Sequence, residues 1–156
     1  MEIERRLRRP QMTYKTESRP VVLHVEDDDG SAYLFRLVLR MEEANIDVFR
    51  LSNGEDAVRF LTRAGIFADA PRPDVVVLDL HLPRKNGRDV LAEIRQQAEL
   101  QDLPLIMFRS SMRREDKEQA VALGANHYIE KSADLDSFVA VTRQLLVYVS
   151  SKTAAS

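Results

Sequence analysis

The sequence predicts an α/β fold in which helices wind doubly around a five-stranded parallel sheet. Three short apolar runs with many β-branched residues, 21–25, 75–80 and 105–108, have the composition of strands that are buried on both faces. Amphipathic segments separate these runs, so strands and helices alternate along the chain. Because crossovers between parallel strands are right-handed, this alternation predicts a sheet with helices on both faces.

Five β units and five α units are expected in order along the chain. Two weaker strand candidates, 46–51 and 126–130, complete the set of strands. The helical segments are recognised by apolar residues three or four positions apart, which places those residues on one face. In the first helix these residues are Leu34, Leu37, Val38 and Met41; in the third they are Val90, Leu91 and Ile94. The second helix starts at Asn53 and Gly54 and carries Val58 and Leu61, and the fourth carries Ala120, Val121 and Leu123 and stops at Gly124. The last helix carries Leu135, Phe138, Val139, Thr142, Leu145, Leu146 and Val149.

Length and composition indicate one folded domain. The chain has 156 residues, which is enough to bury a core without covalent cross-links. We expect this domain to cover 20–149, between an arginine-rich arm at 1–19 and a short tail at 150–156. The absence of cysteine excludes disulfides and thiolate metal sites.

Charge and hydropathy restrict the expected partners and location. The net charge of -2 gives no general attraction to nucleic acid, and too few residues follow the last strand for a DNA-binding module. No apolar run approaches the roughly 18 residues that a membrane span requires, and the charged N-terminus lacks the apolar stretch of a signal peptide. We therefore expect a soluble cytoplasmic protein that binds neither DNA nor a membrane.

Polar side chains gather where the predicted strands end. Glu26 and Asp27 follow the first strand, Asp79 ends the third and Lys131 follows the fifth. The carboxyl ends of parallel strands lie at one edge of a sheet, so these groups are expected to converge. Clustered carboxylates repel one another unless they take up protons or hold a cation, and their oxygens suit Mg²⁺. A carboxylate beside such a cation and a lysine is suited to act as a nucleophile toward phosphorus.

Four segments resemble the CheY-like response regulator receiver family. They are VLHVEDD at 22–28, VVVLDLHLPRKNG at 75–87, PLIMFRSS at 104–111 and GANHYIEKS at 124–132. Their order along the chain and their places at the strand ends make the combined resemblance specific. It covers residues 20–149 and implies a flavodoxin-like receiver fold without an output domain of its own.

The stretch LPRKNGRDVLAEIR at 82–95 is similar to stand-alone receivers that work with bacterial phytochromes and other hybrid kinases. The resemblance implies that a sensor histidine kinase is the phosphoryl donor and that the output passes through protein contacts. It also implies that the protein is not a turnover enzyme, and promotes only its own phosphorylation and dephosphorylation.

The resemblance assigns a role to each polar residue at the strand ends. Asp79 is implied to be the phosphoacceptor, and Lys131 is implied to contact the phosphoryl group. Asp27 corresponds to the carboxylate that binds Mg²⁺ directly, and Glu26 to its neighbour that acts through a water molecule. His81, two residues after the acceptor, would offer its backbone carbonyl to the metal.

The end of the fourth strand departs from the family pattern. Receivers carry Thr or Ser there, whose hydroxyl reports phosphorylation, and in this chain the position falls on Arg109. Two interpretations stay open. Either Ser110 supplies the hydroxyl and Arg109 points to solvent, or Arg109 occupies the switch position and pairs with the acids or with the phosphoryl group. The second puts in doubt the usual coupling to the switch aromatic, which corresponds to Tyr128.

Other functions remain as alternatives. Because Arg109 departs from the family pattern, one alternative is a pseudo-receiver, which binds partners without being phosphorylated. A phosphatase-like hydrolase is weaker, because such enzymes carry their DxD motif on the first strand whereas Asp79 lies on the third. Val141, Val147 and Tyr148 lie beyond the predicted core face of the last helix. Two interpretations of this apolar excess stay open: a homodimer through the face from the fourth strand to the last helix, or a terminal helix that is apolar without binding a partner.

Overall fold

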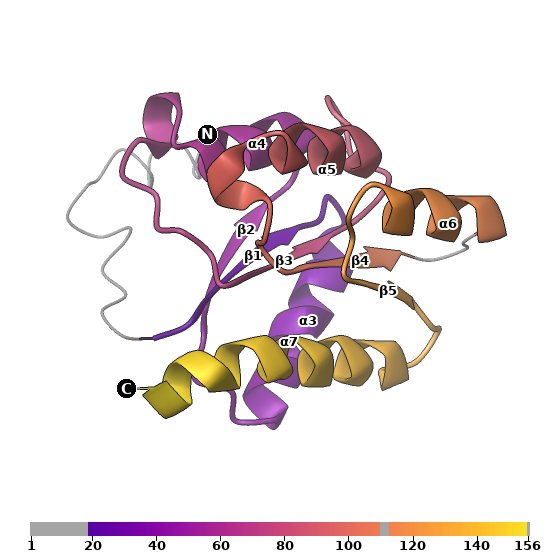
Figure 1. The fold of residues 1–156 in the computed structure, drawn as a ribbon. Coiled ribbons are helices and arrows are strands. Elements are labelled where there is room, and N and C mark those ends of the chain that lie inside the picture. Colours follow the sequence, from indigo (N-terminus) through magenta and orange to yellow (C-terminus); the bar gives the residue numbers. More distant parts are fainter. Residues whose placement is uncertain (1–18, 110–112, 156) are drawn as a thin grey trace.

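A computed structural model describes residues 19–109 and 113–155, and its strands form one parallel sheet in the order β2-β1-β3-β4-β5 (Figure 1). The predicted fold class is confirmed. The strands are β1 (Val21–Val25), β2 (Asp47–Leu51), β3 (Val75–Leu78), β4 (Leu105–Arg109) and β5 (His127–Glu130). Among the predicted tails, residues 1–18 lie outside the described part of the chain.

Helices cover both faces of the sheet. Figure 1 shows α3 and α7 on one face and α4 and α5 on the other, with α6 beside α5 near the β5 edge. The helices are α3 (Asp29–Met41), α4 (Gly54–Thr62), α5 (Gly87–Arg95), α6 (Arg114–Ala122) and α7 (Asp136–Ala155), with short 3-10 turns η1 (Gly65–Phe67) and η2 (Ala98–Leu100). In the described part of the chain, no helix combines the length and the apolar character needed to cross a membrane.

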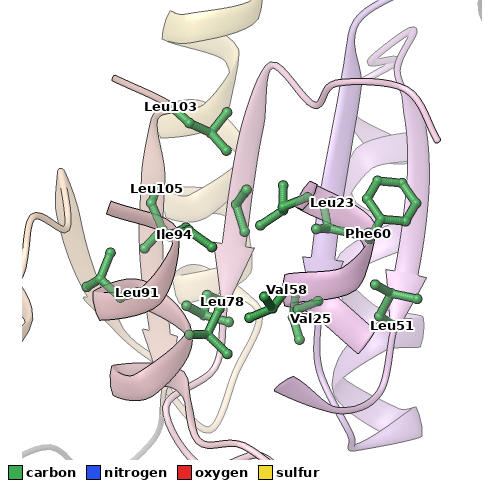
Figure 2. Packing of buried hydrophobic residues seen from close by; sticks show 14 of the residues in the cluster. Leu23, Val25, Leu51, Val58, Phe60, Leu78, Leu91, Ile94, Leu103 and Leu105 are labelled. Atoms are coloured by element: carbon green, nitrogen blue, oxygen red, sulfur yellow. The ribbon is translucent and has the colours of Figure 1, made fainter. Parts of the chain in front are cut away.

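The sheet separates two apolar layers. Alternate residues of a strand point to opposite faces, so Leu23 and Val25 of β1 enter the layer under α4 and α5, whereas Val22 enters the layer under α3 and α7. Figure 2 shows Leu23, Val25 and Leu78 of the strands packed against Val58 of α4 and the apolar side chains of α5. Burial on both faces explains why the central strands read as continuous apolar runs.

Three helix faces differ from those that the sequence predicts. In α6, Val121 was expected on the inner face with Ala120 and is 58% exposed. In α3 the buried residues are Ala32, Phe35, Val38 and Leu39, and Met41 is 63% exposed. The helix carries apolar residues on most of its positions, so spacing alone did not identify the face, which the aromatic ring of Phe35 anchors. In α7, Val141 was expected outside the core face and is fully buried. It continues the helical spacing of the core residues Phe138 and Leu145.

A buried histidine makes stability depend on pH. His24 of β1 is 2% exposed, and its ring centroid lies 4.3 Å from that of Phe35. Burial, followed by the positive charges of Lys131, Arg50 and Arg36, lowers the pKa of His24 to about 3. The unfolded chain takes up this proton near the ordinary value of 6.5. Between these two values the unfolded state binds more protons, so the free energy of unfolding falls as the pH falls.

We expect replacement of His24 by leucine to remove this dependence. Each pH unit below 6.5 costs wild type about 1.4 kcal/mol through His24. The free energy of unfolding of wild type minus that of the variant should therefore fall by about 2 kcal/mol between pH 7 and pH 5. Urea unfolding of both proteins at the two pH values measures this difference. Parallel pH profiles would show that His24 is not responsible.

Candidate functional site

Three carboxylates converge at the carboxyl edge of the sheet. Glu26 and Asp27 follow β1, and Asp79 follows β3; the two strands are in register up to the pair Val25 and Leu78. One carboxylate oxygen from each of the three acids lies within 4.8 Å of the others. Glu26 is 1% exposed and Asp79 is 8% exposed, whereas Asp27 opens to solvent. This arrangement is what the alignment of parallel strand ends predicted.

Lys131 brings a positive charge into the acid cluster from β5. Its Nζ lies 2.5 Å from Oε1 of Glu26 and 3.6 Å from Oδ2 of Asp79. It also donates to Oγ of Ser31 at 3.4 Å and lies 5.3 Å from the centroid of the Phe108 ring. The four groups that were expected to meet are therefore together, although they lie up to 105 positions apart along the chain.

The acid cluster is strained electrostatically. Burial raises the pKa of Glu26 to about 7, and the charge of Asp79 acts in the same direction, while the hydrogen bond and charge of Lys131 oppose it. One ammonium group therefore does not neutralise the cluster. A divalent cation among the oxygens would relieve the remaining repulsion, and the set of hard oxygen donors fits Mg²⁺.

The loop after β3 holds Asp79 in place. The backbone N–H of His81 donates to Oδ1 of Asp79 at 3.2 Å, and the N–H of Gly87 donates to the carbonyl of Leu80 at 2.7 Å. Gly87 passes so close that a Cβ at this position would lie 2.3 Å from the carbonyl oxygen of Asp79. Only glycine allows this approach, so the start of α5 is pressed against the backbone of Asp79.

Replacing Gly87 with alanine is expected to disturb both the fold and the site. The added methyl group would push the 79–80 backbone, at a cost of about 1–3 kcal/mol and a fall in melting temperature of several degrees. Gly30 offers a matched control, because a Cβ there would meet only the side-chain oxygen of Asp28 at 3.3 Å. Thermal unfolding of Gly87→Ala and Gly30→Ala separates the two; equal melting temperatures would contradict the packing argument.

The acids line an open cleft of about 580 Å³. Among the predicted site residues, Glu26, Asp27, Asp79, His81 and Lys131 line it. The cleft residues to which the sequence analysis gave no place in the site are Ser31, Leu34, Ser132, Ala133 and Phe138; of these, Leu34 and Phe138 were predicted only as core residues of their helices. Asp28, also in the lining, caps α3 by accepting from the N–H of Ser31 at 2.7 Å.

Arg109 also lines the cleft. It ends β4 opposite Glu130 of β5, and its side chain is only 14% exposed. Its Nη1 donates to Oδ2 of Asp116 in α6 at 3.3 Å. Arg109 therefore does not extend into solvent, and its described partner is an acid of α6 and not one of the three cleft carboxylates. Ser110, the other candidate for the switch position, lies outside the described residues.

Tyr128 lies on β5 opposite Met107 and is half-buried. Its hydroxyl is shielded from solvent and has no hydrogen-bond partner among the described residues. Burial raises the pKa of Tyr128 to about 12; the charges of Asp116 and Glu130 act in the same direction and that of Arg109 opposes them. The predicted switch aromatic thus stands in the electrostatic field of the Arg109–Asp116 pair.

The parallel sheet with an aspartate at the end of β3, two acids after β1 and a lysine after β5 defines a receiver domain. The chain belongs to the response regulator receiver domain family, and residues 22–143 match the family model. Rcp1 of Synechocystis sp., a response regulator, is 36% identical over 121 residues, which cover 76% of this chain and 82% of Rcp1. The resemblance stated from the sequence is confirmed.

Solved structures of response regulators, two of them described as phytochrome response regulators, share the fold. The phosphorylated cyanobacterial phytochrome response regulator RcpA superposes with a TM-score of 0.78 at 30% identity, covering 85% of this chain and 96% of RcpA. The Mn²⁺-bound form of Rcp1 gives 0.75 at 32% identity, covering 83% and 93%. The bacteriophytochrome response regulator RtBRR gives 0.71 at 32%, covering 81% and 78%. Longer transcriptional regulators also match, such as KdpE of Staphylococcus aureus, of which this chain spans 48% at 30% identity.

Proposed function

We propose that this receiver accepts a phosphoryl group on Asp79 from a sensor histidine kinase and signals through protein contacts. The observation that carries the proposal is the single cleft in which Asp79 lies within 4.8 Å of two further carboxylates and 3.6 Å from the ammonium of Lys131. An oxygen of Asp79 attacks phosphorus, the bond from phosphorus to the histidine nitrogen of the donor breaks, and the imidazole leaves with the bonding electrons.

The residues of the cleft divide the work of this transfer. Asp27, Glu26, Asp79 and the backbone carbonyl of His81 would hold Mg²⁺, which supplies positive charge to the phosphoryl oxygens when bound. Lys131 binds a phosphoryl oxygen and offsets the charge that develops during transfer. Arg109 does not compete for the metal in this structure, because it binds Asp116. This weakens the alternative of a pseudo-receiver that binds partners without being phosphorylated, because that alternative depends on Arg109.

A small phosphodonor tests this proposal without the kinase. Incubation with phosphoramidate and Mg²⁺ should add the mass of one phosphoryl group to the intact protein, and excess EDTA should suppress the gain. Wild type that gains no mass, or gains it equally in EDTA, would refute the proposed chemistry. We expect no steady hydrolysis of phosphomonoesters, because the protein promotes only its own phosphorylation and dephosphorylation.

For the donor we propose a phytochrome-type or other hybrid histidine kinase, acting in the cytoplasm where its ATP is available. The similarity to RcpA and RtBRR supports this choice, since both are described as phytochrome response regulators. Phosphotransfer from a purified bacteriophytochrome kinase, compared with an unrelated histidine kinase, tests it.

We further propose that a second copy binds through the face from β4 to α7, where Val147 is 63% exposed. Sedimentation of wild type and Val147→Asp, with and without phosphodonor, tests the dimer. A monomer under all conditions would contradict it.

A further inference from the structure

One aspartate joins α6 to two arginines, and only one of these arginines belongs to the cleft. Nη1 of Arg109 lies 3.3 Å from Oδ2 of Asp116, with side chains 14% and 18% exposed. Nη1 of Arg88 in α5 lies 4.0 Å from Oδ1 of the same carboxylate, and Arg88 also donates to Gln119 of α6. Arg109 lines the cleft together with Asp79, whereas Arg88 faces the groove between α5 and α6.

Helix α6 has little apolar packing to hold it. Its one buried side chain among the described residues is Ala120, and Val121 is 58% exposed. By contrast, α4 and α5 bury aromatic and aliphatic side chains such as Phe60, Leu61, Leu91 and Ile94. Because apolar burial is the main term that fixes a helix on a sheet, the position of α6 depends strongly on its polar ties.

We propose that Arg109 acts as a latch with two pairing states. Before phosphorylation its guanidinium pairs with Asp116, and after phosphorylation of Asp79 it pairs with the phosphoryl group instead, which loosens α6. The inference rests on the proposed phosphorylation of Asp79. A phosphoryl group places about two negative charges in the cleft that Arg109 already lines. The planar guanidinium fork binds phosphoryl oxygens through two parallel hydrogen bonds, which is a stronger interaction than its present single bond to a carboxylate.

The neighbourhood lowers the cost of this exchange. Asp116 keeps Arg88 when Arg109 leaves, so its carboxylate does not become an unpaired charge. The hydroxyl of Tyr128 has no hydrogen-bond partner in the described residues, and Tyr128 lies close enough to Asp116 to feel its charge. Arginine at the end of β4 would thus link the cleft to α6 by charge, where other receivers use a hydroxyl.

Hydrogen exchange of the α6 amides, measured alongside intact mass, tests the latch. In wild type, phosphoramidate and Mg²⁺ should raise the exchange rate in peptides covering 114–122 by about threefold to fivefold. This is the factor expected when α6 loses the stabilisation of one partly exposed ion pair. Arg109→Gln and Asp116→Asn should show this raised exchange without donor and little further rise with it. Arg88→Gln is the matched control, because it leaves Arg109 on Asp116 and should retain the response to phosphorylation.

Each outcome decides between the two claims. Phosphorylated wild type with unchanged α6 exchange would overturn the latch and leave the proposed function intact. Arg109→Gln that becomes phosphorylated and still responds like wild type would do the same. Wild type that takes up no phosphoryl group overturns the proposed function and the latch together. Thermal unfolding of each variant establishes that the compared proteins are folded.

Discussion

Asp79→Asn is expected to gain no phosphoryl group under conditions in which wild type is fully phosphorylated. The carboxamide has nearly the shape of the carboxylate but lacks the negative charge and the basic oxygen that attack phosphorus. The fold should be retained, because the buried side chain can still accept the hydrogen bond that the N–H of His81 gives to Oδ1. Intact-mass measurement after incubation with phosphoramidate and Mg²⁺ reads the result directly.

The control for this variant is Asp102→Asn, which removes an exposed carboxylate at the opposite end of β4. It should be phosphorylated as fast as wild type. Phosphorylation of Asp79→Asn at the wild-type rate would mean that another residue accepts the group, and the cleft would lose its assigned role.

Lys131→Gln is expected to slow phosphorylation by roughly a hundredfold or more, the usual cost of removing one preorganised charge from a transfer site. The ammonium lies 3.6 Å from the carboxylate of Asp79 and 2.5 Å from Glu26, and it is 11% exposed, so solvent screens it weakly. Its loss also leaves Glu26 buried without its partner, which raises the pKa of Glu26 further above its ordinary value.

Lys117→Gln provides the matched control, since Lys117 is an exposed lysine of α6 outside the cleft. The rate of mass gain with phosphoramidate should separate the two variants clearly. If Lys131→Gln reacts as fast as Lys117→Gln, the lysine is a structural partner of Glu26 and takes no part in the transfer.

Much of the fold could be predicted from the sequence because the composition of the strands indicates that they are buried. The runs ending at Val25 and Leu78 are buried on every residue and are apolar except for His24, and a parallel sheet with helices on both faces buries both sides. The acid cluster follows in turn, since strand ends in register bring Asp79 beside Glu26 whatever their separation along the chain. These parts depend on local pattern and on topology.

The remaining features depend on how side chains settle in three dimensions. The core face of α3 was predicted wrongly because almost every face of that helix carries apolar residues. Tertiary packing determines that Phe35 is buried and Met41 is exposed. The partner of Arg109 was open for a similar reason. Asp116 comes from a helix whose position no local pattern determines. The place of Ser31 in the first turn of α3, close after the acids, was by contrast a signal in the sequence that it lines the cleft.

The identity of the residue that carries the phosphoryl group tests the central claim most directly. Borohydride reduces an aspartyl phosphate to homoserine, and fragmentation of the reduced protein locates that residue in the sequence. Wild type treated with phosphoramidate and Mg²⁺ should contain homoserine at position 79, and omission of the donor should remove it. Homoserine at a different position, or phosphorylated protein without any homoserine, would contradict the account.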